Sequence, residues 1–210
     1  MPLAMALFED RVRAPLHLPA ALRALYARSG ALTVNGAPFV EDSALLTRDA
    51  VAIAGEGEVW RFELRAVPTG WRVPAAEHDA LLLARVLDRD PAQPFTLRLD
   101  RVTFTPGFET PAHGHYGQGI RRLLGGRLFM EIGALTHRLD PGRAWFESGE
   151  EPVTARGLEP GTAFIRCMVL DAGMLGRSSF KAWTPEDESK PRNVAYHQYL
   201  DTVVQLAPGT

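Results

Sequence analysis

The sequence contains little cysteine, no long apolar run and no concentration of charge of one sign. Its one cysteine, Cys167, excludes an internal disulfide, and within the apolar run TAFIRCMVL we expect it to be a buried, unreactive thiol. No apolar run approaches the roughly 18 residues of a membrane-spanning helix. The 23 basic residues are scattered among 25 acidic ones, which gives no basic surface for nucleic acid.

Several catalytic motifs are also missing. The chain has no G-x-S-x-G, no phosphate-binding glycine-rich loop, no C-x-x-C and no zinc-protease helix, so hydrolase and nucleotide-binding functions have no support. Its first residues, MPLAMALFEDR, lack the basic leader of a secretory signal, and we expect a cytoplasmic protein. With 210 residues, 46% of them hydrophobic, the chain can bury a substantial core in one or two domains.

The strongest chemical signal lies in residues 107–126, which read GFETPAHGHYGQGIRRLLGG. Its histidines, His113 and His115, are separated by one residue. On a β-strand such residues project from the same face, so the two imidazoles would lie side by side. Divalent transition metals favour paired imidazoles as ligands, and the segment therefore indicates a metal site.

The spacing of this segment resembles the first motif of the cupin superfamily, G-x5-H-x-H-x3-E-x6-G, from Gly107 to Gly126. After a gap of the compact length seen in microbial cupins, GRAWFESGEEPVTARG from Gly142 resembles the second motif, G-x5-P-x-G-x2-H-x3-N. The resemblance implies an all-β fold with double-stranded β-helix (jelly-roll, RmlC-like) barrels.

The resemblance implies four metal ligands, of which His113 and His115 are present. The glutamate of the first motif falls on Gly119, with Gln118 beside it as a substitute, and the histidine of the second motif falls on Val153. A mononuclear Fe, Mn, Ni, Cu or Zn site on His113, His115 and Gln118 would keep open positions for substrate, as in cupin dioxygenases or isomerases of small metabolites.

Arg121 supports a metal-free alternative. Strand alternation from Gly119 places it on the inward face, where an unpaired guanidinium costs several kcal/mol. It either meets a buried carboxylate, Glu147 or Glu150, or binds an anionic small molecule, since arginine forms bidentate bonds with carboxylates and phosphates. A bulge near Gly119 that turns Arg121 towards solvent is equally open.

The first part of the chain resembles a degenerate copy of the cupin-like part. His17 lies six residues before Arg23, as His115 lies six residues before Arg121, although a proline stands where the counterpart of His113 would be. The Asn35-Gly36 dipeptide between two β-type runs predicts a hairpin. We interpret the repeat as a duplication that gives two barrels in tandem, a bicupin. Chance similarity between β-hairpins is the alternative.

The predicted organisation follows from these segments. A degenerate cupin-like domain covers residues 1–67, a linker 68–93, a cupin domain 94–175, and a tail 176–210 that ends in a strand. In the linker, the apolar spacing of AAEHDALLLARVLD predicts one connecting helix.

Three functions remain open from the sequence. The first is a metal-dependent, dioxygenase-like enzyme acting on a small acidic metabolite. The second is a metal-free protein that binds or senses a small molecule, with Arg121 as its anion anchor. The third is a structural protein that assembles through its barrel edges. We expect a homodimer in which no nucleic acid or membrane takes part.

Overall fold

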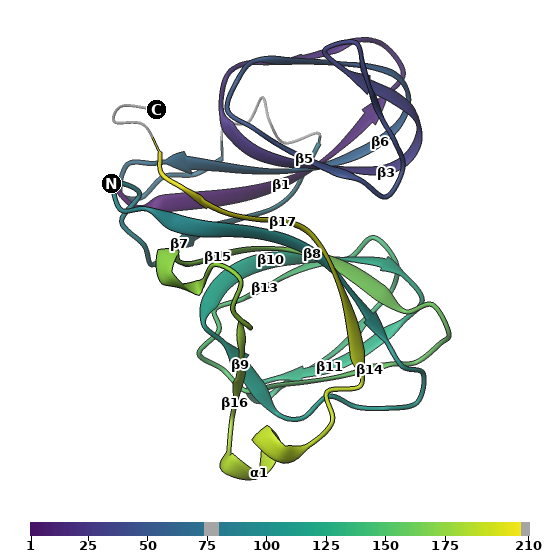
Figure 1. Ribbon diagram of the computed structural model, residues 1–210, viewed down its shortest axis with the longest axis vertical. Coiled ribbons are helices and arrows are strands. Elements are labelled where there is room, and N and C mark those ends of the chain that lie inside the picture. Colours follow the sequence, from purple (N-terminus) through teal and green to yellow (C-terminus); the bar gives the residue numbers. More distant parts are fainter. Residues whose placement is uncertain (74–79, 207–210) are drawn as a thin grey trace. The chain divides into compact units, whose positions relative to one another are not determined.

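The computed structural model describes residues 1–73 and 80–206, which are mostly strands and turns (Figure 1). The chain divides into two compact units. Unit 1 contains the described residues of Met1–Pro94 together with Gln205 and Leu206, and unit 2 contains Phe95–Val204. Within the described ranges, no helix is long and apolar enough to cross a membrane.

Unit 1 is one antiparallel sheet of seven strands. The main order is β4-β3-β6-β1-β7, with β2 paired to β6 and β5 paired to β3. The strands are β1 (Leu3–Val12), β2 (Leu16–Leu18), β3 (Leu22–Val34), β4 (Ala37–Phe39), β5 (Ala44–Thr47), β6 (Val51–Ala66) and β7 (Leu81–Leu87).

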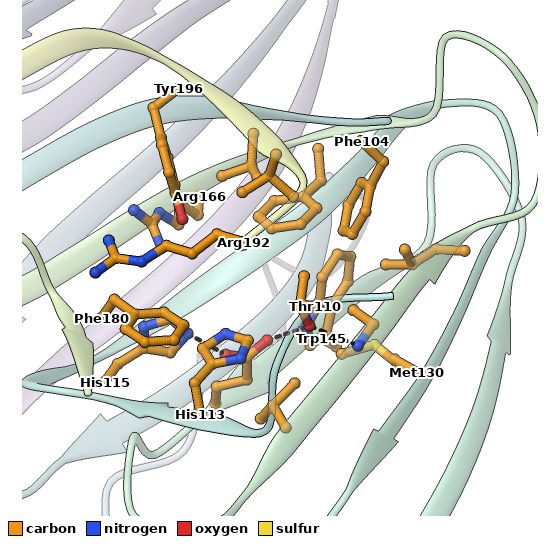
Figure 2. Close-up of a pocket in the computed structure, with 17 residues that line it drawn as sticks. Phe104, Thr110, His113, His115, Met130, Trp145, Arg166, Phe180, Arg192 and Tyr196 are labelled. Carbon is orange, nitrogen blue, oxygen red and sulfur yellow. Dashed lines mark hydrogen bonds and ion pairs between the residues drawn. The ribbon is translucent and has the colours of Figure 1, made fainter. Parts of the chain in front are cut away.

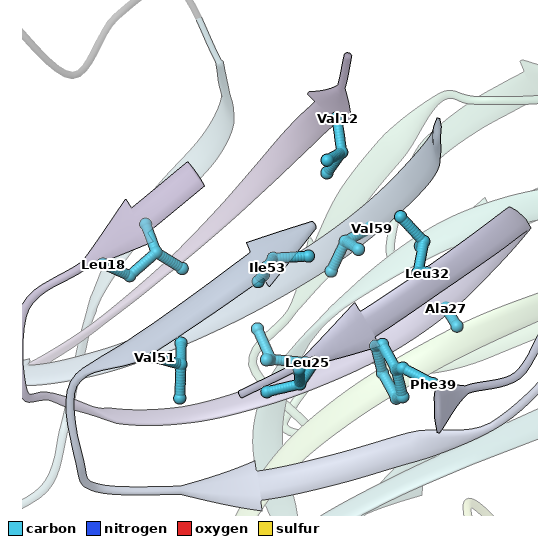
Figure 3. Close-up of a cluster of buried hydrophobic side chains, with 10 residues drawn as sticks. Val12, Leu18, Leu25, Ala27, Leu32, Phe39, Val51, Ile53 and Val59 are labelled. Atoms are coloured by element: carbon cyan, nitrogen blue, oxygen red, sulfur yellow. The ribbon is translucent and has the colours of Figure 1, made fainter. Parts of the chain in front are cut away.

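The long strands β3 and β6 bend together, so that one sheet encloses a core. At the bend Gly30 and Gly55 have φ of 95° and 109°, and a Cβ on either would lie 2.1 Å from a carbonyl oxygen of the facing strand, so only glycine fits. The enclosed cluster is apolar and draws on strands at both ends of the bend, including Leu25, Ile53 and Val59 (Figure 3). The Asn35-Gly36 turn has φ of 48° and 81°, the paired positive values of a two-residue hairpin, which confirms that prediction.

Unit 2 consists of two five-stranded antiparallel sheets, ordered β13-β10-β15-β8-β17 and β12-β11-β14-β9-β16. The first sheet contains β8 (Phe95–Phe104), β10 (Gly117–Gly125), β13 (Ala144–Glu147), β15 (Ala163–Asp171) and β17 (Val194–Val204). The second contains β9 (His113–His115), β11 (Leu128–Ile132), β12 (Leu135–Leu139), β14 (Val153–Gly157) and β16 (Phe180–Ala182). A short 3-10 helix (Ala172–Met174) follows β15, and α1 (Pro185–Ser189) precedes β17.

The hydrophobic core of unit 2 lies between its two sheets. Phe104, Leu123 and Phe164 come from one sheet, and Met130 and Ala155 from the other. Two sheets that share one core form the jelly-roll type of barrel. The predicted all-β, jelly-roll fold class is therefore confirmed.

The predicted connecting helix is wrong where the structure describes it. Residues 81–87 form strand β7, which pairs antiparallel with β1, while residues 74–79 lie outside the described ranges. The run LLLARVL fits helical spacing and a continuous apolar strand equally well, and pairing with β1 decides in favour of the strand. The strand therefore belongs to the sheet of unit 1.

The two units repeat one strand order. In unit 1 the path β5-β3-β6-β1-β7 takes the strands in the same chain order as β13-β10-β15-β8-β17 in unit 2. The last residues of β3 pair with β4, and the first residues of β6 pair with β2. In unit 2, β11 pairs with β12 and β14 pairs with β9 in the corresponding places. Duplication remains a prediction, and this shared order supports it.

Candidate functional site: the barrel cavity of unit 2

A cavity lies inside the barrel of unit 2, and His113 and His115 both line it (Figure 2). Its volume is about 30 Å³, which is room for about two water molecules at about 10–15 Å³ each. The wall is mostly apolar, with Phe104 and Met130 at one end. A larger ligand therefore has to displace side chains of the wall.

The ring of His113 is held by two contacts. Its Nδ1 lies 2.9 Å from the carbonyl oxygen of Pro111, and its ring stacks on Phe180 at 4.8 Å between centroids with 16° between the planes. Burial lowers the pKa of His113, so the ring is neutral at neutral pH. Donation from Nδ1 to the carbonyl then leaves Nε2 as the atom with the lone pair.

His115, Glu147 and Arg121 form a buried charged network. The Oε2 atom of Glu147 lies 3.0 Å from Nε2 of His115 and 2.9 Å from an Nη of Arg121. Trp145 donates from Nε1 to the other carboxylate oxygen of Glu147 at 2.7 Å. Arg121 also donates to the carbonyl oxygen of Gly119. A buried guanidinium and a buried carboxylate thereby neutralise each other.

The protonation states follow from burial and charge. Burial lowers the pKa of His115 to about 3 against the opposing effect of Glu147. Burial alone would raise the pKa of Glu147, but the positive charge of Arg121 and the contacts with His115 and Trp145 hold that pKa well below its usual range. Burial lowers the pKa of Arg121 to about 10. At neutral pH His115 is neutral and the Glu147–Arg121 pair is ionised.

Steric packing explains why the carboxylate comes from Glu147. A Cβ on Gly119 would lie 2.2 Å from the carbonyl oxygen of Cys167, so no side chain fits at the position of the first-motif glutamate. Gly119 faces Glu147 directly across the β10–β13 pair, and opposed residues of a strand pair point to one face. The other motif position, Val153, pairs with His113 and contributes an apolar side chain to the cavity.

Gln118 is not brought together with the two histidines. It precedes the inward-facing Gly119 on β10, so its side chain lies on the opposite face of the strand, and it does not line the cavity. Within the described ranges, this site included, no group of three histidine, cysteine or acidic side chains is placed to hold a metal ion. Glu147 brings a carboxylate to His115, but its charge is already neutralised by Arg121. The donors in this arrangement do not fit a divalent metal.

Arg121 has a partner within the protein instead of a place in the cavity wall. It is fully buried and paired with Glu147, one of the two carboxylates that the sequence indicates, whereas Glu150 is exposed. The bulge that would turn Arg121 towards solvent is not formed, because β10 keeps its register with β13 around this residue. The structure therefore does not place Arg121 where it could touch a ligand in the cavity.

Sequence reasoning missed several polar or aromatic wall residues, among them Arg166, Phe180, Arg192 and Tyr196. Arg166 is buried and forms a bidentate pair with Asp100 at 2.6 and 2.9 Å. The sequence predicts that Arg166 lies on a strand, but its ion-pair partner Asp100 is set by the pairing of β15 with β8. The other three come from the tail, which was expected to end in a strand, and only the strand register shows which tail side chains reach the cavity.

Comparisons with known proteins identify the fold. No protein-family model matches the sequence, and no curated protein matches it. Among solved structures, the chain is similar to a cupin 2 conserved barrel domain protein from Leptotrichia buccalis, with a TM-score of 0.50, 10% identity, and coverage of 80% of this chain and 84% of that one. It is also similar to the protein Ylba from E. coli, with a TM-score of 0.50, 13% identity, and coverage of 80% and 77%.

A third similar structure is salicylate 1,2-dioxygenase from Pseudoaminobacter salicylatoxidans with gentisate adducts. Its TM-score is 0.51 at 12% identity, with coverage of 94% of this chain and 72% of that one. At this level of identity the similarity shows the fold and does not carry over activity. The chain thus has the fold of cupin-domain proteins, as the sequence motifs predict.

Proposed function

We propose that unit 2 is a metal-free binding barrel for a small organic molecule. The proposal rests on one observation: the buried Arg121 guanidinium neutralises Glu147 where the barrel would otherwise need a metal ion to do so. Because Glu147 is already neutralised, a dication at this place would have to separate the buried Glu147–Arg121 pair, which would leave the guanidinium buried without a counter-ion.

The lining of the cavity supports a binding role. Its wall combines aliphatic and aromatic side chains with a few polar groups, among them His113, which is the usual composition of a small-molecule site. The similar salicylate 1,2-dioxygenase structure contains gentisate, so a barrel of this fold accommodates a small molecule. Phe180 and Arg192 are half-buried and Tyr196 is exposed, so packing confines these wall residues less than the buried ones.

The proposal is tested by metal content and by ligand binding on the same full-length protein. Protein purified without chelator is incubated with Fe, Mn, Ni, Cu or Zn, passed through a desalting column, and analysed for metal. We expect well below one equivalent of any of these. The melting temperature is then measured with a panel of small aromatic and aliphatic compounds, with and without EDTA. We expect stabilisation by some compounds that EDTA does not change.

Two results would contradict this function. One equivalent of metal that disappears in His113→Ala would establish a metal centre. Failure of every compound in the panel to raise the melting temperature would argue against a binding barrel. Ala155→Val, which adds two methyl groups to the cavity wall, is the matched variant and should weaken binding without preventing folding.

A metal centre on His113 and His115 is the second candidate, and one observation favours it. His113 donates Nδ1–H to a backbone carbonyl and keeps its Nε2 lone pair, an arrangement that is common among metal-bound histidines. Glu147 would have to replace Gln118 as the third ligand and leave Arg121. The metal measurement above separates the two candidates.

A further inference from the structure

A polar groove adjoins the apolar cavity in unit 2. Its volume is about 240 Å³, and it shares Arg166, Phe180, Arg192 and Tyr196 with the cavity wall. Figure 2 shows Arg166, Arg192 and Tyr196 together at one end of the cavity, away from Met130. The groove and the cavity are therefore adjacent, and together they form a recess with a polar part and an apolar part.

Two of the arginines in the groove are neutralised by the protein. Arg98 binds Asp201 through Nε and an Nη at 2.9 and 3.2 Å, and also donates to two backbone carbonyls. Arg166 binds Asp100 in the same bidentate manner. Each of these guanidiniums thus has a carboxylate of its own.

The other two arginines of the groove, Arg177 and Arg192, have no such carboxylate. In the part of the chain that the structure describes, neither side chain forms an ion pair. Arg192 donates to the hydroxyl of Ser178 at 3.1 Å, and its guanidinium lies 4.1 Å from the centre of the Phe180 ring. The lining of the groove therefore carries two uncompensated positive charges.

We propose that this groove is an anion subsite, in which Arg177 and Arg192 bind the carboxylate of a small organic acid. The apolar part of the acid lies against Phe180 and Tyr196 and enters the cavity. The inference rests on the proposed binding function of unit 2 and names its ligand class. It moves the anion anchor from the buried Arg121 to residues that a ligand can reach.

The chemistry of the recess selects this class. Guanidinium groups bind carboxylates through paired N–H donors, and the Ser178 hydroxyl adds a further donor. Phe180 and Tyr196 present aromatic surface beside these donors. A ligand with a charged head and an apolar body satisfies both parts of the recess, whereas a purely inorganic anion uses only the groove.

The test compares charged and neutral probes of the same shape on the full chain. Dissociation constants are measured calorimetrically for benzoate against benzamide, for hexanoate against hexanamide, and for inorganic phosphate. We expect at least one acid to bind at least tenfold more tightly than its amide and than phosphate. Arg192→Gln and Arg177→Gln should each remove most of this preference, while Arg138→Gln, which changes an exposed arginine outside the groove, should preserve it.

The outcomes separate the subsite from the function on which it rests. Equal binding of acids and amides, or phosphate binding as tight as that of the acids, would overturn the anion subsite and leave the binding barrel standing. Absence of binding by all acids and amides would overturn both. Circular dichroism of each variant shows whether a lost preference comes from the missing guanidinium or from a changed fold, and a preference that persists in a folded double variant would also overturn the subsite.

Discussion

The two units build barrels on the same strand order and fill them differently. In unit 1 the enclosed cluster is aliphatic and aromatic, and His17 is exposed between the inward Leu16 and Leu18. In unit 2 the corresponding region contains His113 and His115 and leaves a cavity. The strand order alone therefore does not make a site, which depends on polar side chains that face inward and on space that the core leaves open.

Both units bury arginines, and the comparison shows what these arginines do. In unit 1 Arg61 binds Asp10 and Glu63 at 2.7 and 2.9 Å, and Arg23 binds Glu63 at 3.2 Å. Arg121 of unit 2 is paired in the same way with Glu147. The buried arginines of both units thus serve as structural cations. The arginines available to a ligand are Arg177 and Arg192 in the groove of unit 2.

The largest expected effect comes from removing the carboxylate of the unit 2 network. Glu147→Leu leaves Arg121 buried without its counter-ion, and we expect a loss of about 3–5 kcal/mol in the free energy of unfolding. Glu147→Gln keeps the size of the side chain and should lose less. Urea unfolding followed by tryptophan fluorescence measures both variants. A Glu147→Leu variant as stable as the wild type would show that Arg121 does not depend on this carboxylate.

Truncation in the core of unit 1 should change stability and leave binding intact. Ile53 is fully buried in the apolar cluster, and Ile53→Ala is expected to cost about 2–4 kcal/mol through lost contacts and a new cavity. The affinity of a folded variant for the acids described above should be unchanged. A loss of binding in that variant would mean that unit 1 shapes the site.

The pH dependence of stability provides a third contrast. His115 has a folded pKa of about 3 against an ordinary value of 6.5, so between these values the unfolded state binds more protons than the folded state. Its contribution to stability is complete above pH 6.5 and is lost as the pH falls towards 3, by up to about 1.4 kcal/mol per pH unit. The lowered pKa of Glu147 adds a loss of the same sign below its ordinary value of 4.5.

Melting temperatures measured from pH 8 to pH 4 test this dependence. The wild type should fall steeply below pH 6.5, and His115→Gln should fall less steeply. His17→Gln in unit 1 is the control and should follow the wild type, because His17 is exposed. Parallel profiles for the wild type and His115→Gln would contradict the buried neutral histidine.

The smallest expected effect is that of a thiol reagent on Cys167 in the folded protein. Cys167 is fully buried, and burial raises its pKa well above the usual range. It should not react with a thiol reagent in the folded protein and should react at once in denaturant. Rapid labelling of the folded protein would show that the sheet around Cys167 opens easily.

The sequence predicts the strands that carry the site better than the partners of the side chains in it. Motif spacing and strand alternation place His113 and His115 side by side on one strand, where the structure has them. They leave Arg121 either inside the barrel or turned to solvent by a bulge, and the structure has it buried. The pairing of Arg121 with Glu147 is one of several outcomes that the sequence leaves open, beside Glu150, an anionic ligand and a bulge towards solvent, because it depends on which strand lies beside β10.

Other features depend on tertiary contacts that no local pattern contains. The run at residues 81–87 fits helix and strand equally, and pairing with β1 determines the outcome. Phe180, Arg192 and Tyr196 follow both motifs in the sequence, and the pairing of β16 with β9 and of β17 with β8 brings this part of the chain to the site. Gln118 stands beside the glutamate position of the first motif, but its side chain lies on the other face of its strand.

The central claim is that Arg121 is the fixed cation of the unit 2 barrel, and Arg121→Gln tests it most directly. The melting temperatures of the wild type, Arg121→Gln and Arg121→Gln/Glu147→Gln are measured with and without Co²⁺. We predict that Co²⁺ stabilises only Arg121→Gln, by about 2–3 kcal/mol at about 100 times its dissociation constant, because Glu147 then has no counter-ion. Co²⁺ stabilisation of the wild type equal to or greater than that of Arg121→Gln would contradict the claim.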